Sequence, residues 1–297
     1  MVLGYVLHTE TRLLDTDFSS KMNTFVFKVA LPVQLFESMV TAGFQEVWNG
    51  GAVLFCLVVT LISILVMMAV SLTQKKALRA EFIQAGYRSS QALLGAALMQ
   101  NIYGHNGPLA LIIIGSVPLY NVAAVLLLTL LSPEGGHLDR KTLGRALREI
   151  VKNPIILAIA AGVAWSLLGI PLPDILGRAV ANLGATATPL GLLALGASID
   201  LKRAVTLWRP TLVSSIFKLV VFVAAFLPAA IWLGYRDELL VAILVMLGSP
   251  ATVSSFTMAR SMGHEGTLSA DAVMMTTICS AFTFTGWLYL LRMLGFI

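Results

Sequence analysis

Residues 101–115 read NIYGHNGPLALIIIG, and their first eight positions interrupt one of the apolar runs of the chain. Two asparagines, a histidine, two glycines and a proline lie between Asn101 and Pro108. In hydrocarbon, unpaired backbone N–H and C=O groups are costly, so non-helical backbone persists only where it faces protein or a wet cavity. The stretch therefore predicts a break in a membrane helix, beside a cavity.

The composition places the chain in a bilayer. Hydrophobic residues make up 58% of its 297 positions, charged residues 12%, and the mean hydropathy is +0.87. A soluble domain of this size has no core large enough for so much apolar surface. Runs able to cross about 30 Å of hydrocarbon occur at 22–42, 50–73, 89–117, 117–132, 154–170, 175–199, 210–233, 239–260 and 267–291.

The net charge of +5 is explained by topology rather than by a nucleic-acid partner. If the chain crosses at every run, only Arg178, Arg236 and Arg292 fall in loops on one side. Basic loops face the cytoplasm. The cytoplasmic set is Arg12, Lys21, Lys75, Lys76, Arg79, Arg88, Arg140, Lys141, Arg145, Arg148, Lys152, Lys202, Arg203, Arg209 and Arg260.

The polar segment SPEGGHLDRKTLGRALREIVKNP, residues 132–154, divides the chain into similar halves. Each half has a span with an internal proline (Pro32, Pro189), a plain span, a broken span and a final plain span. Equivalent spans run in opposite directions, as in an inverted repeat. We expect a first repeat at 1–132 with an incomplete first helix, a cytoplasmic linker at 133–153 and a second repeat at 154–297. The predicted fold is an all-α bundle of five plus five helices with two broken, crossed helices and a truncated first helix.

The two broken spans predict an anion site at the bilayer centre. The second break covers Gly248–Ser255. A proline after each break suits the start of a half-helix, and two opposed N-termini with free N–H groups favour an anion. Ser255 is a further neutral donor. The predicted substrate-binding residues are Asn101, Asn106, Gly107, Pro108, Ser249, Pro250, Ala251, Thr252, Ser254 and Lys218.

Other polar residues in the spans have two interpretations each. Lys218 lies near the midplane, where it attracts the anion or braces the crossed helices through backbone carbonyls. His105 is a proton relay or a hydrogen-bonded structural residue. Lys28 can snorkel to the interface, and Cys56 and Cys279 have no metal or redox spacing. The sequence predicts no metal site and no cofactor.

Several segments resemble the auxin efflux carrier family, whose bacterial members include candidate malonate transporters. Asn101 is followed by Pro108 and Gly115, as in that family. The other segments are LGYVL, LLD and FVFKVALPVQLF near the start, PLGLLALGASID at 189–200 and PATVSSFTMARSMG at 250–263. The similarity covers nearly the whole chain.

The resemblance implies a ten-helix fold like that of bile-acid symporters and sodium/proton antiporters. It implies an elevator-like cycle, in which a transport domain holding the crossed helices moves against a scaffold that commonly dimerises, so a second copy is a candidate partner. It also implies that Asn101 contacts a substrate carboxylate. Of two prolines common in the second crossover only Pro250 is present, and Ser255 occupies the other position.

The leading prediction is a secondary transporter of small organic anions, carboxylates such as malonate, as a multi-pass protein of the cell inner membrane. The alternative is a cation-coupled symporter of the bile-acid type, which sodium-dependent uptake would favour. An enzyme is disfavoured because the chain has no HExxH, GxSxG or paired aspartates. A receptor or purely structural protein would not need two broken helices.

Overall fold

The computed structural model describes residues 2–10, 13–41, 49–91, 95–104, 108–132, 151–198 and 206–297, and every regular element in these ranges is helical. The first half has α1 (Val2–Thr9), α2 (Thr16–Phe25), η1 (Val26–Ala30), α3 (Leu31–Val40), α4 (Gly50–Ser71), η2 (Lys76–Leu78), α5 (Arg79–Tyr87), α6 (Ala96–Tyr103) and α7 (Leu109–Leu130). The second half has α9 (Pro154–Leu168), α10 (Asp174–Ala185), α11 (Ala187–Ala197), α13 (Trp208–Ile216), η4 (Phe217–Val221), α14 (Phe222–Trp232), α15 (Asp237–Gly248), α16 (Val253–Ser261) and α17 (Thr267–Met293). The predicted all-α class is confirmed.

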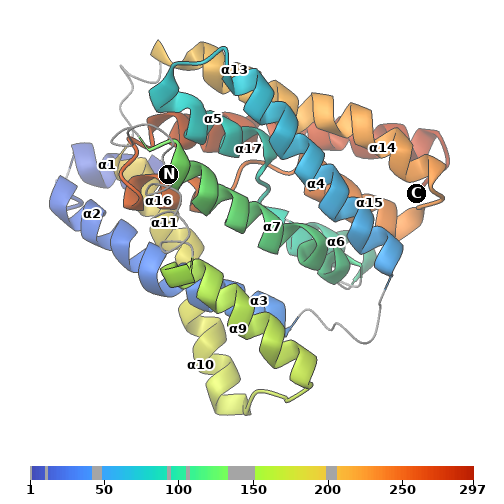
Figure 1. The fold of residues 1–297 in the computed structure, drawn as a ribbon, viewed down its shortest axis with the longest axis horizontal. Helices are drawn as coiled ribbons and strands as arrows, with labels where there is room; N and C mark the ends of the chain where they lie inside the picture. The colour runs from blue at the N-terminus through green and yellow to red at the C-terminus, as the bar shows by residue number, and fades with distance from the viewer. Residues whose placement is uncertain are drawn as a thin grey trace.

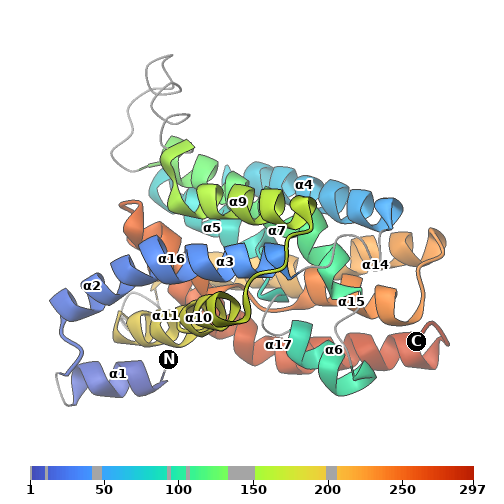
Figure 2. The same cartoon turned by 90° about the horizontal axis from the view of Figure 1, so that it is seen from below.

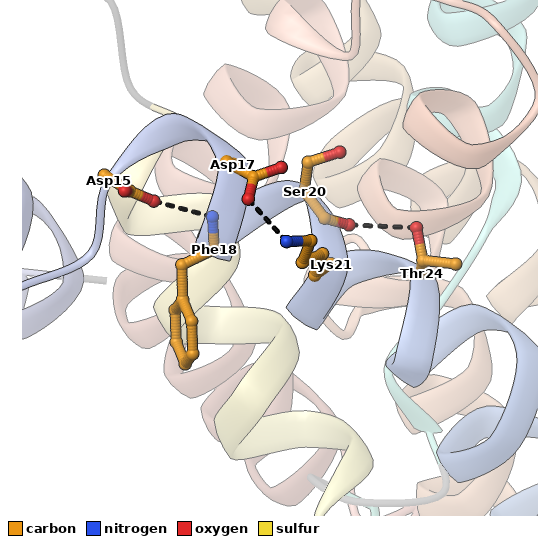
Figure 3. Close-up of polar contacts among 6 residues, drawn as sticks. All are labelled: Asp15, Asp17, Phe18, Ser20, Lys21 and Thr24. Atoms are coloured by element: carbon orange, nitrogen blue, oxygen red, sulfur yellow. Dashed lines mark hydrogen bonds and ion pairs between the residues drawn. The ribbon is translucent and has the colours of Figure 1, made fainter.

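Helix starts follow from local capping chemistry, as α2 illustrates. The Asp15 carboxylate accepts a 2.7 Å hydrogen bond from the Phe18 amide, one of the amides that a helix start leaves unpaired (Figure 3). One turn on, Asp17 and Lys21 form an exposed ion pair at 2.6 Å. The Thr24 hydroxyl donates to the Ser20 carbonyl. From this cap the helix continues through η1, a π-helical turn, into α3.

Six of the described helical segments are long and apolar enough to cross a membrane. They are Gly50–Ser71, Leu111–Leu130, Asp174–Ala197, Trp208–Trp232, Asp237–Ser261 and Thr267–Met293, and Pro154–Leu168 is a shorter apolar helix. The boundary predicted at 117 is wrong, because α7 runs unbroken from Leu109 to Leu130 with Pro118 inside it. A proline is tolerated within a membrane helix when neighbouring groups satisfy the freed carbonyl.

The helices form two bodies. The first body consists of α1, α2, η1, α3, α9, α10 and α11, which pack mainly on one another. The second body consists of α4–α7 and α13–α17. In Figure 1, α3, α9 and α10 occupy the lower part, while α4, α13 and α14 run along the upper side. Contact between the bodies runs chiefly through α16, which packs on α11, α2 and η1, and through α7 on α9.

Close helix packing within each body depends on glycine. A Cβ on Gly162 of α9 would lie 2.9 Å from the Phe36 carbonyl oxygen of α3. A Cβ on Gly115 of α7 would lie 2.7 Å from the Val53 carbonyl oxygen of α4. The glycine that contributes to the family resemblance thus has a packing role, since small residues let membrane helices approach.

Two helices of the second body are interrupted. The break predicted at Gly248–Ser255 is confirmed, because α15 ends at Gly248 and α16 begins at Val253. The chain is also interrupted within the first predicted break, because α6 ends at Tyr103 and α7 begins at Leu109 with Pro108 as its N-cap. A further interruption, which the sequence did not predict, follows Tyr87 at residues 88–90, and Asn101 itself lies inside α6.

The five-plus-five inverted repeat and its boundaries stay predictions. Each half contributes helices to both bodies, as such a repeat requires. Residues 133–150, most of the predicted linker, lie outside the described residues.

Candidate functional site

The two helix breaks lie against each other. The Ser90 amide donates a 2.9 Å hydrogen bond to the Pro250 carbonyl oxygen. The backbone is extended at both places, with φ −74° and ψ 139° at Arg88 and φ −71° and ψ 153° at Ser249. In addition, the Ser89 hydroxyl donates to the Met246 carbonyl in the last turn of α15. Each break thereby supplies hydrogen-bond partners that the other lost by leaving the helix.

Lys218 reinforces this crossing. Its side chain, only 2% exposed, projects from the π-helical turn η4. The ammonium donates to the Ser89 hydroxyl and to the carbonyls of Met246 (3.2 Å) and Leu247 (2.7 Å). An ammonium has three donors, and a positive charge at a helix C-terminus is favourable. The bonds to carbonyls of α15 support the bracing interpretation of Lys218 over attraction of an anion.

A cavity of about 60 Å³ opens at the crossing, between the two bodies. One ordered water needs about 10–15 Å³, so the space accommodates a group of several non-hydrogen atoms. The first body contributes Val26, Leu31, Gln34, Leu35, Ser38, Ala187 and Thr188 to its lining. The second body contributes Ser89, Ser90, Tyr120, Asn121, Thr252, Val253, Ser254 and Thr257.

A second cavity, of about 20 Å³, lies around Lys218. Ser89 and Tyr120 line both cavities, so the crossing separates them. Lys218 lines this second cavity and not the larger one, and its predicted role in substrate binding stays a prediction.

The N-terminal end of α16 borders the larger cavity. Thr252 caps this helix, its hydroxyl accepting from the Ser254 amide at 3.4 Å. The hydroxyls of Thr252 and Ser254 are 3.1 Å apart. Because a helix start carries a partial positive charge of about half a unit, this end of the cavity favours an anionic group. Pro250 lies in the extended linker rather than in the first turn, since Thr252 provides the cap.

Arg88 is the functional candidate that the sequence analysis missed. Its side chain is fully buried, at 0% exposure. The guanidinium donates to Gln84, Met258, Asn121 and Ser254 at 2.8–2.9 Å and lies over the ring of Tyr120. Among the described residues, these partners are all neutral, and Nε has no hydrogen-bond partner. The full positive charge of Arg88 therefore stands one residue layer from the cavity, since Asn121 and Ser254 line it.

Five of the ten predicted site residues lie in or directly after the second break. Thr252 and Ser254 line the cavity. Ser249, Pro250 and Ala251 form the second break, where the Ala251 amide donates to Thr276 and the buried Ser249 hydroxyl has no hydrogen-bond partner in the described structure. Their roles in substrate binding stay predictions.

The residues predicted around the first break lie elsewhere or outside the description. Asn101 is exposed on α6, which packs on α15, and both views show α6 away from α16 (Figures 1 and 2). Pro108 precedes α7, thirteen residues before Asn121, the α7 residue that contacts Arg88. At 1.5 Å per residue, roughly 20 Å of helix separates Pro108 from that contact. The predicted convergence of Pro108 with Pro250 stays a prediction. His105, Asn106 and Gly107 lie outside the described residues.

Comparison with known proteins identifies the family of the chain. A family model described as membrane transport protein matches residues 1–288. The chain belongs to this family, the auxin efflux carriers. The carrier is also 27% identical to a protein of Rhizobium meliloti (strain 1021) named "Putative malonate transporter", over 98% of this chain and 92% of that protein. With its apolar helices, the carrier is a multi-pass membrane protein and a transporter rather than an enzyme.

Proposed function

We propose that this carrier is a secondary transporter of small organic anions, carboxylates of the malonate type, in the cell inner membrane. The observation that carries the proposal is the cavity between the two bodies, where the start of α16 and the buried Arg88 supply positive charge. Neutral donors at Ser90, Asn121 and Ser254 suit the orientation of a carboxylate. The name of the Rhizobium meliloti relative is consistent with this substrate class.

The proposed mechanism is elevator-type alternating access. The second body carries the crossing, and its bracing by Ser90, Pro250 and Lys218 suits movement as one unit. The first body, to which both halves of the chain contribute, serves as the scaffold and as the candidate surface for a homodimer. A substrate held between two bodies is exposed to one side or the other as one body slides along its partner. The lining supports this, because both bodies contribute to it.

Uptake into proteoliposomes tests the proposed function. Purified carrier is reconstituted and given labelled mono- and dicarboxylates, with inward sodium, proton or no ion gradient, and protein-free liposomes provide the background. The proposal expects saturable uptake of carboxylates, with neutral amides of the same acids not transported. Uptake that requires sodium would favour the bile-acid-type symporter instead. Absence of carboxylate uptake under every gradient, from protein that is folded and correctly inserted, contradicts the proposal.

A further inference from the structure

Arg88 is a buried cation without a charged partner among the described residues. A guanidinium stays protonated in proteins, and a buried charge without a counter-charge is unfavourable. Here four neutral acceptors and the face of Tyr120 hold it, and none of them neutralises it. The other nearby cation, Lys218, lines the second cavity and donates to carbonyls of α15. An anion bound in the larger cavity can therefore balance the charge of Arg88.

The larger cavity therefore has two separate sources of positive charge. The start of α16 supplies about half a unit at Thr252. Arg88 supplies a full unit behind Asn121 and Ser254, and both of these residues line the cavity. A substrate with one carboxylate can bind at the helix end without using the charge of Arg88. A substrate with a second carboxylate also supplies the counter-charge that Arg88 lacks.

We propose that Arg88 determines substrate specificity by charge, selecting dianionic over monoanionic substrates. This inference rests on the proposed function and assigns the residue that distinguishes substrates within it. When the dianion enters, one carboxylate lies at the start of α16 and the other lies toward Arg88, in contact with Asn121 and Ser254 or in their place. Arg88 then forms charge-assisted hydrogen bonds, which are stronger than those to neutral acceptors.

The test compares malonate with malonamate, in which an amide of the same shape replaces one carboxylate. KM for both is measured in proteoliposomes at pH 7.5 for wild-type carrier, Arg88→Gln, Arg88→Lys and the exposed control Arg209→Gln. We expect Arg88→Gln to raise KM for malonate at least ~30-fold, the lower end for truncating a buried charge pair, and KM for malonamate less than about 3-fold. Arg88→Lys should retain part of the preference, and Arg209→Gln all of it.

A second pair of variants keeps the inference testable if Arg88→Gln does not fold. Ser254 Oγ is 2.8 Å from Arg88 Nη2 and lies in the first turn of α16, where an acidic side chain is favourable. Ser254→Asp should supply the missing counter-charge internally and weaken malonate binding at least tenfold more than the neutral, similarly shaped Ser254→Asn. Equal effects of Asp and Asn would overturn the inference.

The outcomes also separate this inference from the proposed function. If Arg88→Gln leaves the ratio of the two KM values unchanged, whether by affecting neither substrate or both equally, Arg88 has only a structural role and the inference is wrong while the carrier remains an anion transporter. If wild-type protein transports neither substrate, the proposed function fails, and the inference with it.

Discussion

Ser90 and Pro250 join the two broken helices directly, through a 2.9 Å hydrogen bond from the Ser90 amide to the Pro250 carbonyl. The contact with the second break is therefore made at residues 88–90, one helical segment before the polar cluster at 101–108. As a result Ser89 and Ser90 line the cavity, and Arg88 lies one residue layer behind it.

The bracing role of Lys218 predicts a loss of stability when its ammonium is removed. Lys218→Met leaves the Met246 and Leu247 carbonyls and the Ser89 hydroxyl without this donor. At about 1–3 kcal/mol per buried unsatisfied group, we expect the free energy of unfolding to fall by about 3 kcal/mol, measured by unfolding in detergent. The matched control is Lys28→Met, because Lys28 is an exposed lysine in another π-helical turn, η1. A Lys218→Met protein as stable as this control would show that the brace is unimportant.

The interface between the bodies predicts a variant that binds but transports slowly. A Cβ on Gly191 of α11 would lie 2.9 Å from Val253 Cγ1 of α16. Gly191→Val should therefore hinder sliding of the second body along the first and lower the maximal uptake rate roughly tenfold, for an overpacking cost of about 1–3 kcal/mol. Substrate affinity, measured by calorimetry, should change much less.

The control for this prediction is Gly177→Val on α10, where the nearest atom to an added Cβ is Leu172 Cβ at 3.8 Å. It should transport at close to the wild-type rate. If both valine variants are equally slow, or Gly191→Val is as fast as wild type, the two bodies do not slide along α11 and α16.

Glu81 predicts a local effect at the start of α17. Its buried carboxylate accepts hydrogen bonds from the Gly266 amide at 2.9 Å and the Ser269 amide at 3.0 Å. Hydrogen bonds to charged groups contribute about 1.5–3 kcal/mol each, so Glu81→Ala should lower stability by about 3 kcal/mol. Amide exchange of the first turn of α17 should accelerate, while exposed Glu10→Ala leaves it unchanged. Unaltered exchange in Glu81→Ala would contradict this capping role.

Sequence patterning predicted the helical class, the positions of most long spans and the second break. The second break was visible because Pro250 and four hydroxyl residues interrupt an otherwise apolar run. Helix α16 could be placed from the same residues, although its start at Val253 depends on the Thr252 cap rather than on proline.

The break at residues 88–90 could not be found in this way. Hydropathy places an arginine outside the bilayer, so Arg88 was assigned to a cytoplasmic loop. For the same reason α5, which contains Glu81 and Gln84, was not assigned to any membrane span. Asn121 of α7 and Ser254 of α16 accept hydrogen bonds from Arg88, and an amide at the start of α17 donates to Glu81. No local sequence pattern reveals such tertiary contacts. The glycines and asparagines at 101–108 did indicate an interruption, because α6 ends at Tyr103 and α7 begins at Leu109. The contact with the second break is made instead by Ser90.

The central claim is that the carboxylate site lies at the crossing formed by residues 88–90. Protection of single cysteines by substrate tests this claim most directly. In a chain carrying Cys56→Ala and Cys279→Ser, Ser90→Cys and Asn101→Cys are each reacted with a membrane-permeant thiol reagent, with and without malonate. The cavity predicts that malonate slows modification at Ser90→Cys several-fold and leaves Asn101→Cys unaffected. Protection of Asn101→Cys with none at Ser90→Cys would contradict the account and return the site to residues 101–108.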